Sequence, residues 1–436
     1  MQQIRIEELY ELYVNSTGVT TDTRSINEGC IFFALKGEKF DANQFADEAL
    51  TKGAGYAVVD GVMPEAWIQK WGSRLVHVKN VLLTLQRLAG YHRHQLECPV
   101  LAITGSNGKT TTKELVAAVM AKKFQTYATR GNLNNHIGIP LTLLSIKNDV
   151  EFAVIEMGAN HQGEIASYCE YVNADFGLIT NIGSAHLEGF GGPEGVVKGK
   201  TELYDDLMDR GGKVFVNRDS DLLWQKILFF GFSPDDVITY GASENVFCKG
   251  EPVSGNEFLT LHTQDLTIRT NLVGEYNFEN VLSAVCVGKY FGVHLDDIKE
   301  AIENYVPSNN RSQKVSHGGA TIVLDAYNAN PSSMAEALKN FEKQAGNNKV
   351  VILGEMMELG DYSRAEHENI LQQLSGMTLT RKVLTGDGFA FAKQQPGITW
   401  FATTAEVKEW FQAQQWDNAL VLIKGSRKNE LEKMLK

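Results

Sequence analysis

The sequence lacks the usual marks of a secreted or membrane-spanning protein. Its five cysteines are odd in number and scattered, with no Cys-x-x-Cys pair, so we expect neither a disulfide framework nor a zinc knuckle. The first eight residues are acidic and lack the apolar core of a signal peptide. No apolar run approaches the roughly 18 residues of a transmembrane helix. We therefore expect a protein of the reducing cytoplasm without stable membrane insertion.

An excess of basic charge is also absent. The chain carries 41 Lys and Arg against 53 Asp and Glu, a net charge of −12, so general nucleic-acid binding is not expected. An anionic ligand such as a nucleotide would need a local positive site and a metal. Internal repeats and low-complexity segments are absent too. The 436 residues predict two to four domains at about 100–200 residues each.

One stretch organises what is present. The apolar run 100–104 ends at a small glycine-bearing loop, and a helical pattern opens at Lys109. A strand, a glycine loop and a helix N-terminus together form a cradle for phosphate. We expect Lys109 to reach the outer phosphates and the Thr110 hydroxyl to bind Mg²⁺. The loop residues expected at the nucleotide are Gly105, Ser106, Asn107, Gly108 and Thr111.

The loop is shorter than the usual phosphate-binding pattern. The first glycine of G-x-x-x-x-G-K-[ST] would fall on Ile103. The alternative is a glycine turn before a helix that carries a surface lysine. The order of strand, loop and helix favours phosphate.

The pattern of strands and helices predicts an α/β protein of three domains. Residues 1–97 form a small N-terminal α/β domain, 98–306 a central domain with a doubly wound, mostly parallel sheet, and 307–436 a third α/β unit. Alternating residues at 258–262 and 266–270 predict a hairpin at the edge of the central sheet. Further helices are expected to start near Pro331, Arg364, Thr404 and Lys428.

Polar residues follow the ends of the central strands. In doubly wound sheets ligands bind at the carboxyl ends of the strands, so Lys109, Glu156 and Asn181 are expected beside one another. A carboxylate across from a phosphate loop suits Mg²⁺, although Glu156 could instead cap a helix. His186 follows the third strand end and is a candidate metal ligand, with a structural histidine as the alternative.

Several other candidates stay open on the residues alone. Lys198 and Lys200 open a helix, where basic side chains are unfavourable, but two solvated lysines would explain them as well. Arg311 could meet phosphate or form an interdomain salt link. Asp325 could accept from a ribose hydroxyl or cap a strand. The polar turns 20–24 and 36–42 are ligand loops or plain surface turns.

Taken together, these motifs resemble the Mur ligases, the ATP-dependent amide ligases of peptidoglycan assembly. The resemblance spans all three predicted domains. It rests on the stretches 104–111, 131–140, 156–160, 181–191, 325–331, 353–360 and 424–427. The Asn-Leu-Asn-Asn, Tyr-Asn-Ala-Asn-Pro and His-Leu-Glu-Gly-Phe-Gly stretches are typical of the branch that adds D-alanyl-D-alanine to UDP-N-acetylmuramoyl-tripeptide.

The resemblance implies a UDP-binding N-terminal domain, a central ATPase domain and a C-terminal Rossmann-like domain. It implies that the tripeptide carboxylate attacks the ATP γ-phosphate and that the amine of D-alanyl-D-alanine then attacks the acyl phosphate, giving an amide, ADP and phosphate. The implied cofactors are ATP and Mg²⁺, and the implied substrates are small molecules. We expect a monomer.

Site roles follow from the resemblance. Thr110 and Glu156 would hold one Mg²⁺, and His186 with a carbamylated Lys200 the second, so that Lys109, His186 and Lys200 would be catalytic. Lys200 is preferred to Lys198 by its distance from an aromatic residue. The remaining implied contacts are Asn280 to adenine, Asp325 to ribose, Arg311 to phosphate, Thr23, Arg24 and Lys36 to the uridine nucleotide, and Asn135, Asn328 and Asn330 to the substrate cleft.

Two positions depart from the family pattern, and three alternatives remain. Tyr276 stands where the family usually has His, and Ala326 where a second acidic residue is common. The alternatives are a sister amide ligase (another Mur enzyme or a folylpolyglutamate synthase type), a small-molecule P-loop kinase and a non-catalytic nucleotide-binding module.

Overall fold

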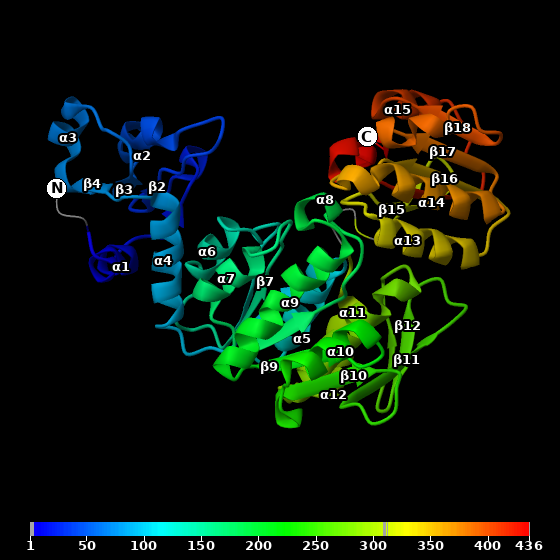
Figure 1. Ribbon diagram of the computed structural model, residues 1–436, viewed down its shortest axis with the longest axis horizontal. Coiled ribbons are helices and arrows are strands. Elements are labelled where there is room, and N and C mark those ends of the chain that lie inside the picture. Colours follow the sequence, from blue (N-terminus) through cyan, green and yellow to red (C-terminus); the bar gives the residue numbers. More distant parts are fainter. Residues whose placement is uncertain (1–3, 308–310, 312, 436) are drawn as a thin grey trace. The chain divides into compact units, whose positions relative to one another are not determined.

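The computed structural model describes residues 4–307, 311 and 313–435. The chain forms two compact units: one contains residues up to 102, 124–158 and 164–176, and the other 103–123, 159–163 and 177 onward. Three sheets follow one another along the chain, coloured from blue through green to red in Figure 1. No helix of the described residues combines the length and apolarity needed to cross a bilayer.

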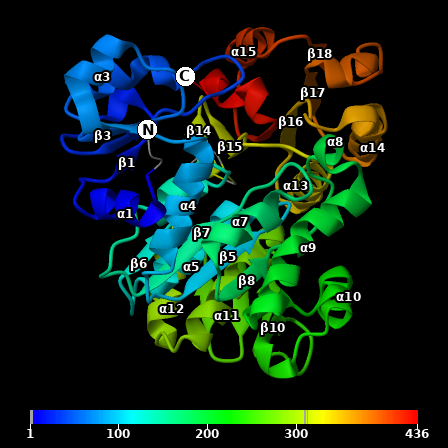
Figure 2. The ribbon, with the colours of Figure 1, turned by 60° about the vertical axis from the view of Figure 1, so that its left-hand side comes forward.

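The first sheet is small and parallel, in the order β1-β2-β3-β4. Its inner strands bury apolar side chains such as Phe32 and Val58. Helix α1 lies against α4 (Figure 2). The elements of this region are α1 (Ile6–Val14), β1 (Val19–Thr20), β2 (Ile31–Phe33), α2 (Ala46–Thr51), β3 (Tyr56–Val59), α3 (Glu65–Trp71), β4 (Leu75–His77) and α4 (Val81–Arg93).

The central sheet has nine strands in the order β13-β12-β11-β10-β9-β8-β5-β7-β6. Its strands and first helices are β5 (Val100–Thr104), α5 (Lys109–Met120), β6 (Thr126–Ala128), α6 (Gly138–Leu143), β7 (Phe152–Glu156), α7 (Glu164–Val172), β8 (Phe176–Ile179), α8 (Leu187–Phe190) and α9 (Pro193–Arg210). It continues with β9 (Lys213–Asn217), α10 (Asp221–Phe230), β10 (Val237–Gly241), β11 (Cys248–Val253), β12 (Thr260–Thr263), β13 (Thr267–Arg269), α11 (Phe278–Tyr290) and α12 (Leu295–Asn304).

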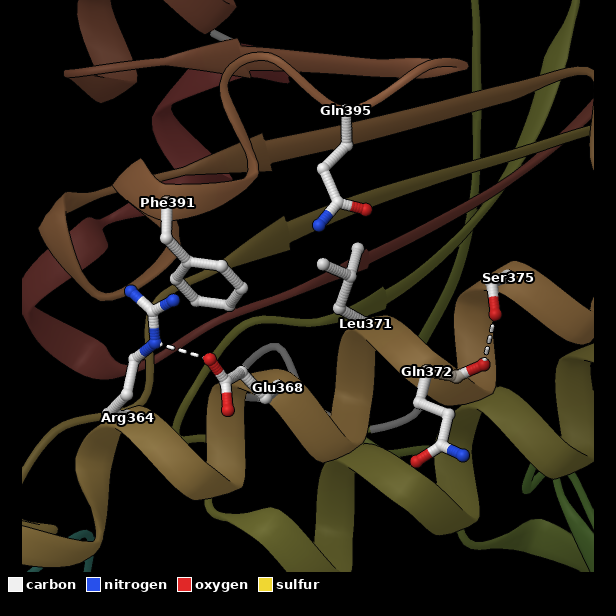
Figure 3. A pocket seen from close by; sticks show the side chains of 7 residues that line it. All are labelled: Arg364, Glu368, Leu371, Gln372, Ser375, Phe391 and Gln395. Carbon is white, nitrogen blue, oxygen red and sulfur yellow. Dashed lines mark hydrogen bonds and ion pairs between the residues drawn. The ribbon is translucent and has the colours of Figure 1, made fainter.

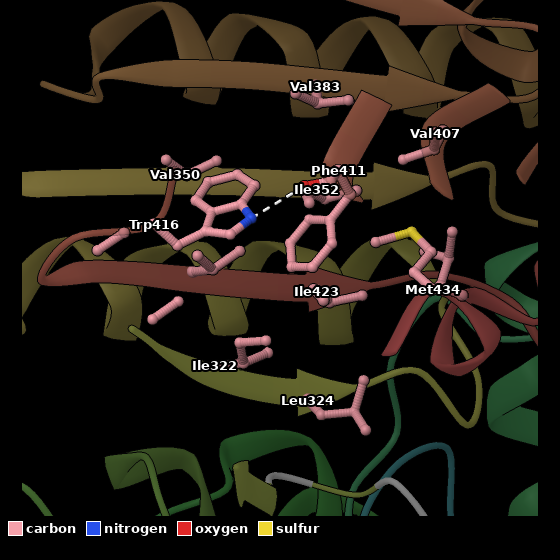
Figure 4. Close-up of a cluster of buried hydrophobic side chains, with 14 of the residues drawn as sticks. Ile322, Leu324, Val350, Ile352, Val383, Val407, Phe411, Trp416, Ile423 and Met434 are labelled. Atoms are coloured by element: carbon pink, nitrogen blue, oxygen red, sulfur yellow. Dashed lines mark hydrogen bonds between the residues drawn. The ribbon is translucent and has the colours of Figure 1, made fainter. Parts of the chain in front are cut away.

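The third sheet has six strands in the order β14-β15-β19-β16-β17-β18, antiparallel only between β14 and β15. Trp416, Phe411 and Met434 pack on one face of it, and the Trp416 indole donates to the Phe411 carbonyl at 3.0 Å (Figure 4). The elements are β14 (Gln313–His317), β15 (Ala320–Asp325), α13 (Pro331–Lys343), β16 (Asn348–Gly354), α14 (Ser363–Gly376), β17 (Arg381–Thr385), β18 (Ile398–Phe401), α15 (Thr404–Gln412) and β19 (Ala419–Lys424).

The structure confirms the α/β class, the three sheets and the edge hairpin, which is formed by β12 and β13. All five cysteines are buried thiols that take no part in disulfides. The helix expected near Lys428 is wrong. Two 3-10 turns occur there instead, Arg427–Asn429 and Leu431–Leu435, because Glu430 between them has φ +48°, which no right-handed helix accommodates. The domain boundaries at 97 and 306 stay predictions.

Candidate active site

The phosphate loop joins the end of β5 to the start of α5. All five residues of β5 are buried, and α5 buries Leu115 and Val116 against the fold. Gly108 takes φ +79° directly before the helix. A helix N-terminus presents backbone N–H groups and the positive end of the helix dipole, so this loop can bind an anion.

Both loop glycines are required by space as well as by backbone angle. A Cβ on Gly105 (φ +140°) would meet the Thr180 hydroxyl oxygen at 2.0 Å, and one on Gly108 would meet Oδ1 of Asn280 at 2.3 Å. The loop therefore approaches its neighbours too closely for any other residue. The absence of a glycine at position 103 has a matching reason, because Ile103 is a fully buried core residue of β5.

Asn181 braces the loop from the neighbouring strand end. Its carbonyl accepts from Ser106 N at 2.9 Å, its Oδ1 accepts from Asn107 N at 3.0 Å, and its Nδ2 donates to the Asn107 carbonyl at 3.2 Å. β5 lies between β8 and β7 in the sheet. The strands that precede Lys109 and Asn181 and the strand that ends at Glu156 are therefore neighbours in the sheet, and the expectation that the three side chains lie beside one another stays a prediction. The bracing role of Asn181 was not predicted.

Lys109 folds over the loop that precedes it. Its Nζ donates to the carbonyls of Gly105 at 2.7 Å and Ser106 at 3.2 Å. Thr110 and Thr111 on the first turn of α5 are both buried. The lysine ammonium therefore lies against the loop backbone, and its contact with phosphate stays a prediction.

Glu156 ends β7 and is 1 % exposed. Its Oε1 accepts from Asn134 Nδ2 at 2.8 Å, and its backbone N–H donates to the Thr129 hydroxyl at 2.9 Å. A carboxylate this deeply buried is not a surface residue, and it is part of a strand rather than a helix cap. Asn134, adjacent to the predicted Asn135, is a contact that sequence reasoning missed.

Lys200 is 0 % exposed, so it is not a solvated surface lysine. Lys198, by contrast, is exposed. The Lys200 Nζ donates to the Ala159 carbonyl at 3.0 Å and lies 4.8 Å from the centroid of the Phe190 ring. Helix α9 places it there by starting at Pro193 after Gly192. A charged lysine in such a site is costly, and conversion to a carbamate would place an anionic oxygen ligand there.

His186 precedes α8 and contacts a residue that was not predicted. Its Nδ1 is hydrogen-bonded to Oε2 of Glu358, in the loop after β16. The hydrogen bond to the imidazole holds the pKa of Glu358 below its usual range, against the opposing effect of burial.

The donor types of the predicted metal ligands fit Mg²⁺ better than a transition metal. No group of three His, Cys, Asp or Glu side chains gathers within the described part of the chain. Mg²⁺ binds through one or two carboxylates, keeps several waters and takes the rest of its ligands from phosphate. A buried carboxylate, a threonine hydroxyl and a lysine able to become a carbamate therefore suit it.

The start of α13 contacts the phosphate loop. Asn330 donates from Nδ2 to Asn107 Oδ1 at 2.8 Å, and Asn107 Nδ2 donates to the Ser332 hydroxyl at 3.0 Å. Asn330 also caps α13 by accepting from Ser333 N at 2.9 Å. Its place in a substrate cleft stays a prediction, but its side chain does reach the phosphate loop.

Asp325 and Arg311 have partners within the third sheet region. Asp325 Oδ2 pairs with Nζ of the buried Lys424 at 2.5 Å, which is an ion pair rather than a strand cap. The same Nζ lies 3.4 Å from the Asn328 carbonyl. The Arg311 guanidinium stacks 3.8 Å from the centroid of the Tyr327 ring. The predicted ribose, phosphate and substrate contacts of Asp325, Arg311 and Asn328 stay predictions.

Asn280 and Asn135 both form hydrogen bonds within the protein. Asn280 Oδ1 accepts from the Thr112 hydroxyl at 3.1 Å, and its Nδ2 donates to Asn277 Oδ1 at 3.1 Å. Asn135 accepts from the backbone of Ile137 and Gly138 before α6. Contact with adenine or substrate would add to these roles.

The predicted uridine-nucleotide residues lie on exposed loops. Arg24 forms an ion pair with Asp22 at 2.7 Å, and Lys36 one with Asp41 at 3.3 Å. Thr23 starts the 3-10 turn that carries Arg24. In both loops a neighbouring carboxylate pairs with the cation, and the ligand of these loops stays a prediction.

A separate hollow of about 330 Å³ lies between α14 and the 3-10 turn Asp387–Ala392 (Figure 3). Arg364 donates to Glu368 at 2.5 Å and stacks over Phe391 at 3.8 Å. None of the predicted site residues lines it, so we assign it no part in the site.

Comparison with known proteins agrees with this geometry. Residues 103–288 match the Mur ligase middle domain, and residues 310–427 match the Mur ligase, glutamate ligase domain. The UDP-N-acetylmuramoyl-tripeptide–D-alanyl-D-alanine ligase of Escherichia coli strain K12 is 33% identical, over 98% of this chain and 95% of its own length. The enzyme of the same name from Bacillus subtilis strain 168 is 30% identical, over 96% and 92%.

Solved structures show the same relationship. A crystal structure of MurF from Acinetobacter baumannii superposes with a TM-score of 0.84 at 31% identity, covering 95% of this chain and 92% of that one. The match therefore extends beyond the phosphate loop to all three sheets. This chain belongs to the Mur ligase family.

Proposed function

We propose that the protein is an ATP-dependent ligase that joins D-alanyl-D-alanine to UDP-N-acetylmuramoyl-tripeptide in peptidoglycan precursor synthesis. The observation that carries this proposal is near-full-length similarity, at 30–33% identity, to two curated ligases of that name. The braced phosphate loop with Lys109 over it supports the nucleotide half of the reaction.

The phosphates of ATP would lie against the loop 105–108 and the first turn of α5. The N-terminus of α5 and the ammonium of Lys109 would face the phosphates, and the Asn181 brace would keep the loop in its binding conformation before nucleotide arrives. Preorganised donors of this kind stabilise charge that develops during phosphoryl transfer. Arg311, Asp325 and Asn280 would complete the nucleotide contacts.

Thr110 and Glu156 would hold one Mg²⁺, and His186 with carbamylated Lys200 the second. When bound, the metal supplies neutralisation of phosphate charge and orientation of the reacting oxygens. The chain's own work is positioning. Lys109 would hold the γ-phosphate in line with the tripeptide carboxylate, and the buried setting of Glu156 and Lys200 would keep bulk water away from the acyl phosphate.

The uridine nucleotide would bind the N-terminal domain through Thr23, Arg24 and Lys36, and Asn135, Asn328 and Asn330 would line the path of the two peptides. The substrates are small molecules, and we propose a cytoplasmic monomer.

An amine-specificity assay tests this function. The protein is incubated with ATP, Mg²⁺, UDP-N-acetylmuramoyl-tripeptide and either D-alanyl-D-alanine or the amine of a sister ligase, and ADP release is measured. We expect ADP release and an amide product when the amine is D-alanyl-D-alanine, and neither product with the amine of a sister ligase. Release only with another amine would indicate a sister ligase, and a phosphorylated product without an amide would indicate a kinase.

A further inference from the structure

Two loops far apart in the sequence meet at His186 and Glu358, 172 positions apart. Both residues adopt left-handed backbone conformations, with φ of +55° and +62°. Only six non-glycine residues of the described chain have positive φ, and these two contact each other. Such strained conformations persist where the surrounding structure enforces them, and they gather at functional sites.

The loop that carries Glu358 is held at several points. The Glu358 carbonyl accepts from Glu188 N at 3.2 Å. Two residues earlier, Met356 N donates to Nε2 of the buried His367 at 3.0 Å. A Cβ on Gly360 would lie 3.1 Å from the Glu188 side chain, so the loop packs tightly against α8. The carboxylate is thus presented to His186 by a fixed backbone.

The partner atoms determine the state of the imidazole. An ionised carboxylate only accepts hydrogen bonds, so Nδ1 of His186 must carry the proton that Glu358 accepts. The Nε2 atom of a neutral ring then keeps its lone pair. Histidines that bind metals almost always donate their other ring N–H to a carboxylate, a carbonyl or water, which fixes the tautomer and raises the basicity of the ligand nitrogen.

We propose that Glu358 is a positioning residue that fixes the tautomer and orientation of His186, so that Nε2 is presented to the Mg²⁺ of the active site. This inference rests on the proposed role of His186 as a metal ligand. Glu358 does not touch the metal and acts through the imidazole. It also gives the C-terminal sheet region, through the loop after β16, a direct part in building the metal site.

The test uses Mn²⁺ as a paramagnetic substitute for Mg²⁺, with the full chain and a non-hydrolysable ATP analogue. Electron spin echo modulation detects ¹⁴N of a coordinating imidazole, and a Mn²⁺ titration gives the affinity. The variants are Glu358→Ala, Glu358→Gln and His186→Ala. Glu430→Gln is the matched control, because Glu430 has φ +48° and an ion pair with Lys433.

We expect Glu358→Ala to weaken Mn²⁺ binding about 10- to 100-fold, the usual effect of losing a carboxylate behind a metal-bound histidine, and to reduce the ¹⁴N signal. Glu358→Gln, which can still accept from Nδ1–H, should lie between Glu358→Ala and the parent, and Glu430→Gln should match the parent. If circular dichroism shows that Glu358→Ala does not fold, the Mn²⁺ affinity of Glu358→Gln provides the test.

The outcomes separate two failures. The ¹⁴N signal could disappear in His186→Ala while both Glu358 variants keep the signal and the Mn²⁺ affinity of the parent. That result overturns the positioning role of Glu358 but supports His186 as a metal ligand. A parent without any ¹⁴N signal, or an unchanged signal in His186→Ala, overturns the metal role and the inference with it.

Discussion

The side chain of Asn181 binds the backbone of Asn107 in both directions, accepting from its N–H at 3.0 Å and donating to its carbonyl at 3.2 Å. Asn107 lies in the phosphate loop, and Asn181 follows the neighbouring strand β8. One amide side chain therefore fixes the backbone that must receive the nucleotide.

Asn181→Ala should weaken nucleotide binding without unfolding the protein. The variant loses two hydrogen bonds, each worth about 0.5–1.5 kcal/mol, so we expect ADP affinity to fall about tenfold, equivalent to about 1.4 kcal/mol. Isothermal titration calorimetry measures this. The control is Asn256→Ala in the exposed connection between β11 and β12, where the side chain donates to the Val253 carbonyl at 3.4 Å. Parental affinity in Asn181→Ala would show that the loop keeps its shape unaided.

Gly108→Ala should destabilise the protein more than Gly211→Ala. Both glycines have left-handed backbone, at φ +79° and +71°, which costs an alanine about 1–2 kcal/mol. A Cβ on Gly211 would enter open space, whereas one on Gly108 would meet Asn280 Oδ1 at 2.3 Å. We expect Gly108→Ala to cost about 1–3 kcal/mol more through this overlap.

The stabilities of the two variants are compared by their melting temperatures in the absence of nucleotide. Equal melting temperatures would mean that Asn280 moves aside at no cost.

Much of this arrangement follows from local sequence signals, and some of it cannot. The buried run 100–104, the following glycines and the opening helix are adjacent in the chain, so sequence alone predicts the phosphate loop. The partnership of His186 with Glu358 joins residues 172 positions apart, and no local pattern reports it. The left-handed Glu430 likewise depends on tertiary context, so the expected helix near Lys428 was wrong. The short distance between Asn280 and Gly108 is also a tertiary feature, because it arises from the packing of α11 on α5.

Stability should fall as the solution becomes acidic, in part because of His367. Burial holds its pKa below the usual value, and Nε2 must stay unprotonated to accept from Met356 N. Below about pH 6.5, the ordinary pKa of histidine, the unfolded chain takes up a proton that the folded chain resists. The contribution of His367 is therefore complete above that pH and is lost as the pH drops toward the folded-state pKa.

His367→Gln removes this titration and keeps an acceptor for Met356 N, so the melting temperature of the variant should depend less on pH below about 6.5. The variant should keep part of the dependence of melting temperature on pH, because burial also lowers the pKa of His92. His294→Gln, at an exposed site, is the control. A slope identical to that of the parent would assign the acid sensitivity to other groups.

Lys200, and not Lys198, should carry a carbamate. Lys200 is fully buried beside the Ala159 carbonyl, whereas Lys198, two residues away on the same helix, is exposed. In ¹³C-bicarbonate the parent should show one carbamate resonance by NMR that Lys198→Arg retains and Lys200→Arg loses. Ligase activity should disappear in Lys200→Arg alone. A resonance that persists in Lys200→Arg would assign the modification elsewhere.

The transfer of oxygen from substrate to phosphate tests the central claim most directly. UDP-N-acetylmuramoyl-tripeptide labelled with ¹⁸O in its terminal carboxylate is incubated with the protein, ATP, Mg²⁺ and D-alanyl-D-alanine, and the products are analysed by mass spectrometry. An acyl phosphate mechanism predicts one ¹⁸O atom in the released phosphate and one in the new amide. Unlabelled phosphate, or ATP consumption without an amide product, would contradict the account.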